Sequence, residues 1–333
     1  MSKPEVAIIP IFLPQVGCAH RCIYCNQRVV TGVTSPPTPA EVSSFVGKII
    51  TENPGKYCVA LYGGSISALP DTELVHYLSA IRSTQPAKSI TGIRLSTRPD
   101  AVSPPKLRLL KEYGVTTVEL GVQSLDNAVL ERIKRGHDAI SVYRATELLK
   151  PSEITVGFHL MIGLPGQSAD SFHQTVEETV ALSPDTVRLH PTLILADTEL
   201  AEMWRRGEYE PLNLEEAVTE CTWAYQRFRR AGIAVIRMGL QEVSGLGVKV
   251  LAGPHHPAFG ELVITRFLRE RVEKALVSRV NKTKDVKVKV SARALSLFIG
   301  QKRSNLSYFL ERWGISVEFT PDETIKDYNF ELG

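Results

Sequence analysis

The stretch Val118-Glu119-Leu120-Gly121-Val122-Gln123 carries the pattern that decides the fold, because apolar residues alternate with polar or small ones along it. Neighbouring side chains of a β-strand point to opposite faces of its sheet. The apolar side chains therefore pack on one face, and Glu119, Gly121 and Gln123 lie on the other. We predict a strand that is buried against helices on one side and lines a polar space on the other.

Similar short runs recur along the chain and alternate with longer amphipathic segments. Such alternation is typical of βα units around a parallel sheet. Helices are expected over 104–113, 127–135 and 168–182, with the polar residues Ser103 and Asp126 at two of their starts. The strands are expected at 6–13, 58–62, 92–96, 117–122, 154–162, 186–193 and 234–240. The pattern predicts an α/β fold with a partial (β/α)6-type barrel.

The same alternation places polar side chains on the inner face of several strands. A closed eight-stranded barrel fills its centre with branched aliphatic side chains, whereas a polar, arginine-rich interior favours an open cavity for a charged ligand. A network of internal salt bridges at the strand ends is the alternative. The residues expected to face inward are Arg94, Ser96, Arg98, His159, Arg188, His190, Arg237 and Gln241.

The overall composition is that of a globular chain with a second, smaller domain. Its 333 residues, 43% of them hydrophobic, are enough for one large core and a small α/β unit after it. A glycine-spaced link at 244–247 predicts domains at residues 1–245 and 246–333. The chain has neither a run of about twenty apolar residues nor the layout of a secretory signal. We expect a soluble, cytoplasmic protein that does not bind a membrane.

Three of the five cysteines lie within eight positions, as Cys18-x3-Cys22-x2-Cys25, directly after the first predicted strand. Such crowding favours metal ligation over a disulfide framework. Three thiolates on one loop can hold a [4Fe–4S] cluster and leave its fourth iron without a protein ligand. Structural zinc needs four closed ligands, and no second cysteine pair or suitably placed Cys-His pair completes them. The other two cysteines, Cys58 and Cys221, are predicted to be buried packing residues.

With Tyr24 before its last cysteine, this motif resembles that of the radical SAM superfamily. Further motifs follow in the superfamily's order. They are Leu61-Tyr62-Gly63-Gly64-Ser65, Gly121-Val122-Gln123-Ser124, Lys134-Arg135-Gly136-His137 and Met161-Ile162-Gly163-Leu164-Pro165-Gly166. The resemblance implies a [4Fe–4S] cluster on Cys18, Cys22 and Cys25 that binds and cleaves S-adenosylmethionine.

The resemblance also implies which residues contact S-adenosylmethionine. The glycine pair ends the second strand, where exposed backbone can meet the amino group of the cofactor, since glycine lets a ligand approach the main chain closely. Gln123 and Arg135 match the stretch that contacts the ribose and the carboxylate. The candidate cofactor-binding residues are Tyr24, Gly63, Gly64, Ser65, Gln123 and Arg135.

Within the superfamily, the chain resembles the radical SAM half of the catalytic subunit of Elongator. The passages that carry this resemblance are 96–100, 118–124, and 189–193 together with 202–209. That family modifies wobble uridines of tRNA and adds a C-terminal acetyltransferase domain, for which we find no acetyl-CoA-binding motif after Glu242. Ser96 stands where the family usually has Glu. The oxygen-independent coproporphyrinogen oxidases share several of the same motifs.

The C-terminal segment is rich in basic residues, as a surface that follows a phosphate backbone requires. Residues 286–290 predict a strand with lysines on one side. Residues 297–306 resemble the turn of a KH domain, in which a GxxG loop between two helices clamps nucleotides. The candidate RNA-binding residues are Gly300, Gln301, Lys302 and Arg303, with Arg303 in place of the family's second glycine. A small domain whose lysines only keep it soluble is the alternative.

The resemblance implies that the enzyme forms a 5′-deoxyadenosyl radical, which abstracts hydrogen from a substrate. His159, Arg188 and His190 are the candidate catalytic residues on the cavity wall, unless they are hydrogen-bonded internally. We predict a radical SAM enzyme that modifies RNA, with tRNA as substrate and ferredoxin or flavodoxin as reductant. The alternatives are a radical SAM enzyme for a small metabolite and a nucleic-acid-binding protein with a non-catalytic cluster.

Overall fold

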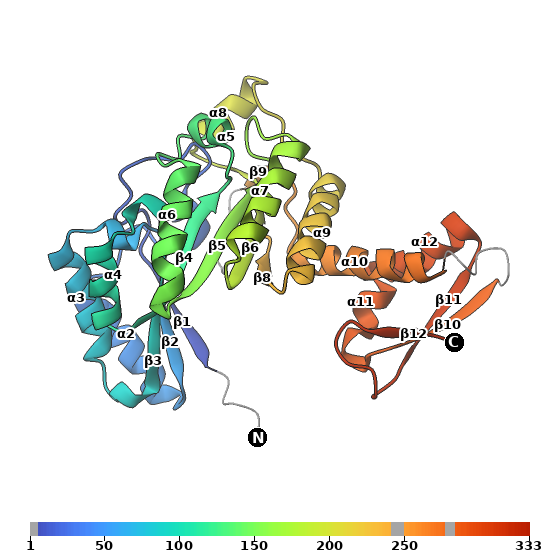
Figure 1. Cartoon of the computed structure of the whole chain (residues 1–333), viewed down its shortest axis with the longest axis horizontal. Helices are drawn as coiled ribbons and strands as arrows, with labels where there is room; N and C mark the ends of the chain where they lie inside the picture. The colour runs from blue at the N-terminus through green and yellow to red at the C-terminus, as the bar shows by residue number, and fades with distance from the viewer. Residues whose placement is uncertain (1–5, 241–249, 277–283) are drawn as a thin grey trace.

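A computed structural model describes residues 6–240, 250–276 and 284–333 of the chain. Seven parallel strands form one curled sheet in the order β1-β2-β3-β4-β5-β6-β8, with helices along its outer side (Figure 1). The strands are β1 (Ala7–Phe12), β2 (Tyr57–Tyr62), β3 (Ile90–Thr97), β4 (Val115–Gln123), β5 (Thr155–Ile162), β6 (Thr186–Pro191) and β8 (Ala234–Met238). All seven overlap the predicted runs, so the partial barrel is confirmed, with seven strands in its sheet.

Most of the helices that connect the strands start at a polar residue whose side chain caps the first turn, whereas the helix after Pro70 has no such cap. Asp126 and Ser103 accept backbone N–H bonds at the starts of α5 and α4, as predicted. Helix α5 ends at Arg132, before the predicted 135, because Lys134 takes a φ of 54° and turns the chain. The helices are α1 (Gln27–Thr31), α2 (Pro39–Glu52), α3 (Asp71–Arg82), α4 (Pro104–Glu112), α5 (Asn127–Arg132), α6 (Ala139–Leu149), α7 (Ala169–Leu182), α8 (Glu199–Arg205) and α9 (Leu214–Arg230).

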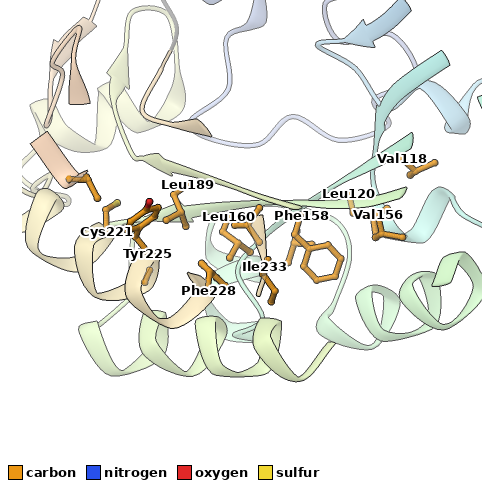
Figure 2. Packing of buried hydrophobic residues seen from close by; sticks show 14 of the residues in the cluster. Val118, Leu120, Val156, Phe158, Leu160, Leu189, Cys221, Tyr225, Phe228 and Ile233 are labelled. Atoms are coloured by element: carbon orange, nitrogen blue, oxygen red, sulfur yellow. The ribbon is translucent and has the colours of Figure 1, made fainter. Parts of the chain in front are cut away.

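The main core lies between the outer face of the sheet and these helices (Figure 2). Phe158 of β5 and Leu189 of β6 pack in the same cluster as Phe228 of α9. Cys221 is fully buried there, which confirms its predicted packing role. The prediction for Cys58 is wrong, because its side chain lies on the inner face of β2 near Arg94 and is only partly buried.

The chain after the barrel remains in contact with it. Strand β9 (Val250–Ala252) pairs with β7 (Ile194–Leu195), and α10 (Phe259–Leu276) packs against α9 before it leads to the C-terminal unit (Figure 1). The predicted division at 245/246 and the predicted inward residue Gln241 both lie outside the described residues. No helix in the described ranges combines the length and apolar character that a membrane span requires.

The C-terminal unit is a small α/β structure. Strand β10 (Asp285–Val290) lies between β11 (Ser316–Pro321), which is parallel to it, and β12 (Phe330–Leu332), which is antiparallel. Its valines are buried and its lysines exposed, so the predicted strand is confirmed. Two helices connect β10 to β11, namely α11 (Leu295–Ile299) and α12 (Ser304–Trp313).

Candidate active site

The cysteine loop leaves the end of β1 and is held against the turn after β2. The backbone N–H of Gln15 donates to the Gly63 carbonyl at 2.7 Å, and that of Ser65 donates to the Val16 carbonyl at 2.8 Å. A side chain at Gly64 would place its Cβ 2.3 Å from the Val16 carbonyl oxygen. The glycine pair therefore lets two backbone segments pack closely, which fixes the start of the loop that carries the cysteines.

We expect Gly64→Ala to lower both the stability of the chain and its capacity to hold iron. The new Cβ forces the backbone at Val16 to move, and overpacking of this kind costs about 1–3 kcal/mol. The midpoint of urea unfolding and the iron content after anaerobic reconstitution measure the two effects. Gly55→Ala is the control, because a Cβ there meets only ordinary contacts with Tyr57. Equal iron content in the two variants would contradict this role of Gly64.

Arg135 lies between β4 and the cysteine loop. Its Nη2 donates to the Gly121 carbonyl at 2.6 Å, and its Nη1 donates to Cys22 Sγ at 3.3 Å. A Cβ on Gly121 would lie 2.4 Å from Nη2, so a larger residue at this position would shift the guanidinium. The sequence motifs include both Gly121 and Arg135, but only the tertiary structure shows that the two residues are in contact.

The donor set of the loop fits an iron–sulfur cluster. Burial, with the charges of Cys22 and Cys18, raises the pKa of the Cys25 thiol to about 12. The pKa of Cys25 depends on the other two cysteines, so the three thiols lie close together on one loop, beside the permanent cation Arg135. Thiolates are the soft ligands that iron–sulfur clusters take. Within the described ranges, no three His, Cys, Asp or Glu side chains are arranged to hold a metal ion as they stand.

The other candidate cofactor residues have different surroundings. The Gln123 side chain is buried, and its Oε1 has no hydrogen-bond partner in the part of the chain that the structure describes. A buried oxygen of this kind is a group that a ligand would satisfy. The Ser65 hydroxyl is instead bonded within the protein, since it lies 3.2 Å from Thr97 Oγ1 and accepts from the Arg98 N–H. Ser65 therefore supports the strand ends through its side chain.

A cavity of about 640 Å³ lies inside the curl of the sheet and includes part of the cysteine loop. This volume is in the range of ligand-binding sites. The structure brings together Tyr24 and Cys25 of the loop with the three candidate catalytic residues. The polar residues that line the cavity include Tyr24, Cys25, Ser96, Glu119, His159, Arg188, His190 and Arg237. The open cavity predicted from the sequence is confirmed.

The predicted alternative, an internal salt-bridge network, is also present beside the cavity. Glu119 Oε1 accepts from Arg94 Nη1 and from Arg188 Nη2, each at 2.7 Å. Arg188 Nη2 also donates to the Tyr62 hydroxyl at 3.0 Å. Arg98 does not line the cavity, because β3 ends at Thr97 and the guanidinium bonds to Asp100 and to the Gly136 carbonyl. Glu119 thus orients Arg188, a role that alternation alone does not reveal.

His159 and His190 form a pair on the cavity wall. Their ring centroids lie 4.2 Å apart, and neither Nε2 has a hydrogen-bond partner in the described part of the chain. Burial, helped by Arg188 and Arg237, lowers the pKa of His190 to about 3, and burial next to His190 lowers the pKa of His159 as well. Both imidazoles are therefore neutral at pH 7, and internal hydrogen bonds do not satisfy their Nε2 atoms.

The predicted GxxG-like loop lies between α11 and α12, as the resemblance implied. Gly300 has a φ of 78°, and a Cβ there would lie 2.4 Å from Ser304 Oγ. Gln301, Lys302 and Arg303 are exposed. The two helices are joined below the loop by buried Asn305, whose Nδ2 donates to the Phe298 carbonyl at 2.9 Å. The loop therefore presents two cationic side chains to solvent, between two helices that Asn305 ties together.

Two successive segments of the chain match models of known protein families. Residues 12–179 match the family described as "Radical SAM superfamily", and residues 184–269 match "Radical_SAM C-terminal domain". The tRNA uridine(34) acetyltransferase of Methanocaldococcus jannaschii is 40% identical over 201 residues, which are 60% of this chain and 35% of that protein. The tRNA uridine(34) acetyltransferase of Dehalococcoides mccartyi is 36% identical over 203 residues, which are 58% and 43%. The chain thus spans less than half the length of these curated relatives.

The fold has a counterpart among solved structures. The archaeal Methanocaldococcus infernus Elp3 with an N-terminal deletion superposes with a TM-score of 0.60 and 23% identity. The superposition covers 82% of this chain and 64% of that one. At 23% identity this match shows the fold alone. It covers a larger share of the chain than residues 12–179, which match the superfamily.

Proposed function

Since the chain belongs to the radical SAM superfamily and is a radical SAM enzyme, we propose that it cleaves S-adenosylmethionine reductively in order to modify tRNA. One observation carries the catalytic part of this proposal. Tyr24 and Cys25 of the cysteine loop line the same cavity as His159, Arg188 and His190. A reactive group formed at the loop would therefore face the same cavity as these polar side chains.

Members of this family use a [4Fe–4S] cluster and S-adenosylmethionine, which together supply the one-electron chemistry that yields a 5′-deoxyadenosyl radical. In this chain, Cys18, Cys22 and Cys25 would hold the cluster and leave one iron open to the cofactor. Arg135 keeps a positive charge beside Cys22 and ties the loop to β4 through the Gly121 carbonyl.

The remaining residues would bind and enclose the organic ligands. We assign Tyr24, Gly63, Gly64 and Gln123 to S-adenosylmethionine, with Arg135 beside its carboxylate and Ser65 supporting the turn. His159, Arg188 and His190 would contact the substrate on the opposite part of the cavity wall. Because Glu119 holds Arg188 in place, the guanidinium is oriented before the substrate arrives.

Two observations support tRNA as the substrate. Curated relatives of 36% to 40% identity are named as tRNA uridine(34) acetyltransferases. The C-terminal unit adds an exposed Gly300-Gln301-Lys302-Arg303 loop of the kind that clamps nucleotides in KH domains. We propose that this loop holds the RNA while the barrel modifies it, in the cytoplasm and with ferredoxin or flavodoxin as electron donor.

The proposed function is tested anaerobically with the full chain. The protein is reconstituted with iron and sulfide, given S-adenosylmethionine and dithionite, and assayed for 5′-deoxyadenosine with and without bulk tRNA. We expect 5′-deoxyadenosine in both reactions and more of it with tRNA. No product from a cluster-loaded protein would overturn the catalytic proposal, and product that tRNA does not raise would favour a small-metabolite substrate.

Lys302→Gln is expected to weaken the binding of bulk tRNA and to lower its salt dependence. Each lost phosphate contact reduces the slope of log K against log salt by about 1. Filter binding at several salt concentrations measures both quantities. Lys111→Gln removes an equal charge from an exposed position on α4 and is the matched control. The same slope for wild type and both variants would exclude Lys302 from the RNA contact.

A further inference from the structure

The cavity has two chemically different walls. Strands β1 and β8 lie at opposite ends of the sheet order, yet residues of both line the cavity because the sheet curls. The β1 wall is apolar and carries Ile8, Pro10 and Phe12. The opposite wall is formed by β5, β6 and β8 and carries the histidine pair together with two arginines. A ligand that fills the space between them would be apolar on one side and polar on the other.

The polar wall has an excess of positive charge. Among the described lining residues, Arg188 and Arg237 face only one carboxylate, Glu119. That carboxylate already accepts from both Arg188 and Arg94. Burial and the charge of Arg188 lower the pKa of Arg237, as expected for two cations on one wall. An anion between the arginines would relieve this repulsion.

The same wall has several hydrogen-bonding atoms without partners. The Nε2 atoms of His159 and His190 and the Nε of Arg188 are buried and unbonded in the described part of the chain. Buried polar atoms in native proteins are normally bonded, and each exception requires an explanation. In the Nε2–H tautomer a neutral imidazole donates to an anionic oxygen, and so does a guanidinium N–H. A bound hydrogen-bond acceptor would give these three nitrogens the partner that the described part of the chain does not provide.

We propose that His159, His190, Arg188 and Arg237 form a binding site for an anionic oxygen group of the substrate, either a carboxylate or a phosphate, with the apolar body of the substrate on the β1 wall. This inference rests on the proposed function in one respect, because it takes the cavity as the substrate site. The neutral imidazoles donate hydrogen bonds to the anion, and the arginines supply its counter-charge. A cationic wall that faces an apolar wall therefore fits an organic anion as the ligand of this cavity.

The test uses full-length, cluster-loaded protein labelled with ¹³C in its histidine rings, without S-adenosylmethionine. Sodium acetate and inorganic phosphate are titrated separately, and the resonances of His159 and His190 are assigned from His159→Gln and His190→Gln. We expect saturable shifts of these two resonances, with those of His76 and His173 as internal references outside the cavity. Tighter binding of phosphate would identify a nucleotide-type anion, and tighter binding of acetate a carboxylate; either supports the site.

Variants separate this site from general salt effects. Arg237→Gln is expected to weaken binding by about tenfold or more, because it removes one charge-assisted hydrogen bond. Arg237→Lys keeps the charge and should retain most of the affinity, and Arg230→Gln removes an exposed charge at the end of α9 as the matched control. Shifts absent with both anions, or equal affinity in Arg237→Gln and wild type, would overturn the anion site. Neither result depends on cleavage of S-adenosylmethionine, so the proposed function would stand.

Discussion

Cys22→Ala is expected to reduce 5′-deoxyadenosine formation to the level of a reaction without protein. The variant removes one of three thiols on a single loop, and a cluster held by the remaining two would lose its iron or its geometry. It also removes the sulfur to which Arg135 donates at 3.3 Å, so the guanidinium loses its contact with the loop. Product analysis after anaerobic reconstitution, together with iron and sulfide content, measures the effect.

Cys58→Ala is the matched control for this experiment. Cys58 is also a free thiol on the inner side of the barrel, but it lies on β2 near Arg94, away from the cysteine loop. We expect iron content and product formation to stay near those of the wild type. Full activity in Cys22→Ala, or loss of iron in Cys58→Ala alone, would show that the cluster ligands have been wrongly assigned.

Glu119→Gln is expected to lower the free energy of unfolding by about 3 kcal/mol, because the two arginines beside it lose their buried counter-charge. The side chains of Arg94 and Arg188 are only 17% and 16% exposed, so water compensates little for the lost charge. The variant should also free Arg188 from its fixed orientation on the cavity wall. Urea unfolding of the full chain, with the midpoint and slope fitted together, measures the loss.

A surface pair provides the comparison for Glu119. Glu202 and Arg205 are paired on α8 with exposed side chains, and such pairs contribute little to stability. Glu202→Gln should therefore change the free energy of unfolding by less than about 0.5 kcal/mol. Similar losses in the two variants would mean that the Glu119 network contributes no more than a solvated ion pair.

The parts of the fold that the sequence predicted correctly depend on local patterns. Alternation along 118–123 marks a strand whether or not its neighbours are known, and a residue such as Asp126 can cap a helix with its own side chain. The cysteine motif is local in the same sense, since all three thiols belong to one loop. The turn at 300–303 was recognisable from its resemblance to the KH-domain loop, and the structure places it between α11 and α12 with a φ of 78° at Gly300.

Local patterns failed where a distant residue decides the environment. Cys58 lies in an apolar run, but alternation with the core residue Val59 places its side chain on the inner face of β2, near Arg94 of the next strand. The pairing of β9 with β7 joins residues on either side of the predicted domain division. This pairing has no periodic signature, because it depends on which strands become neighbours.

The sequence by itself determined the parallel strands, the position of the three-cysteine loop after the first strand, and the family to which the chain belongs. Only the tertiary structure decided that Arg135 crosses Gly121 to reach Cys22, that Glu119 holds two arginines, and that the Nε2 atoms of His159 and His190 are left unbonded in one cavity. The physical reason is that side-chain periodicity fixes the face on which a residue lies, whereas hydrogen bonds and ion pairs depend on distances between strands that are far apart in the chain.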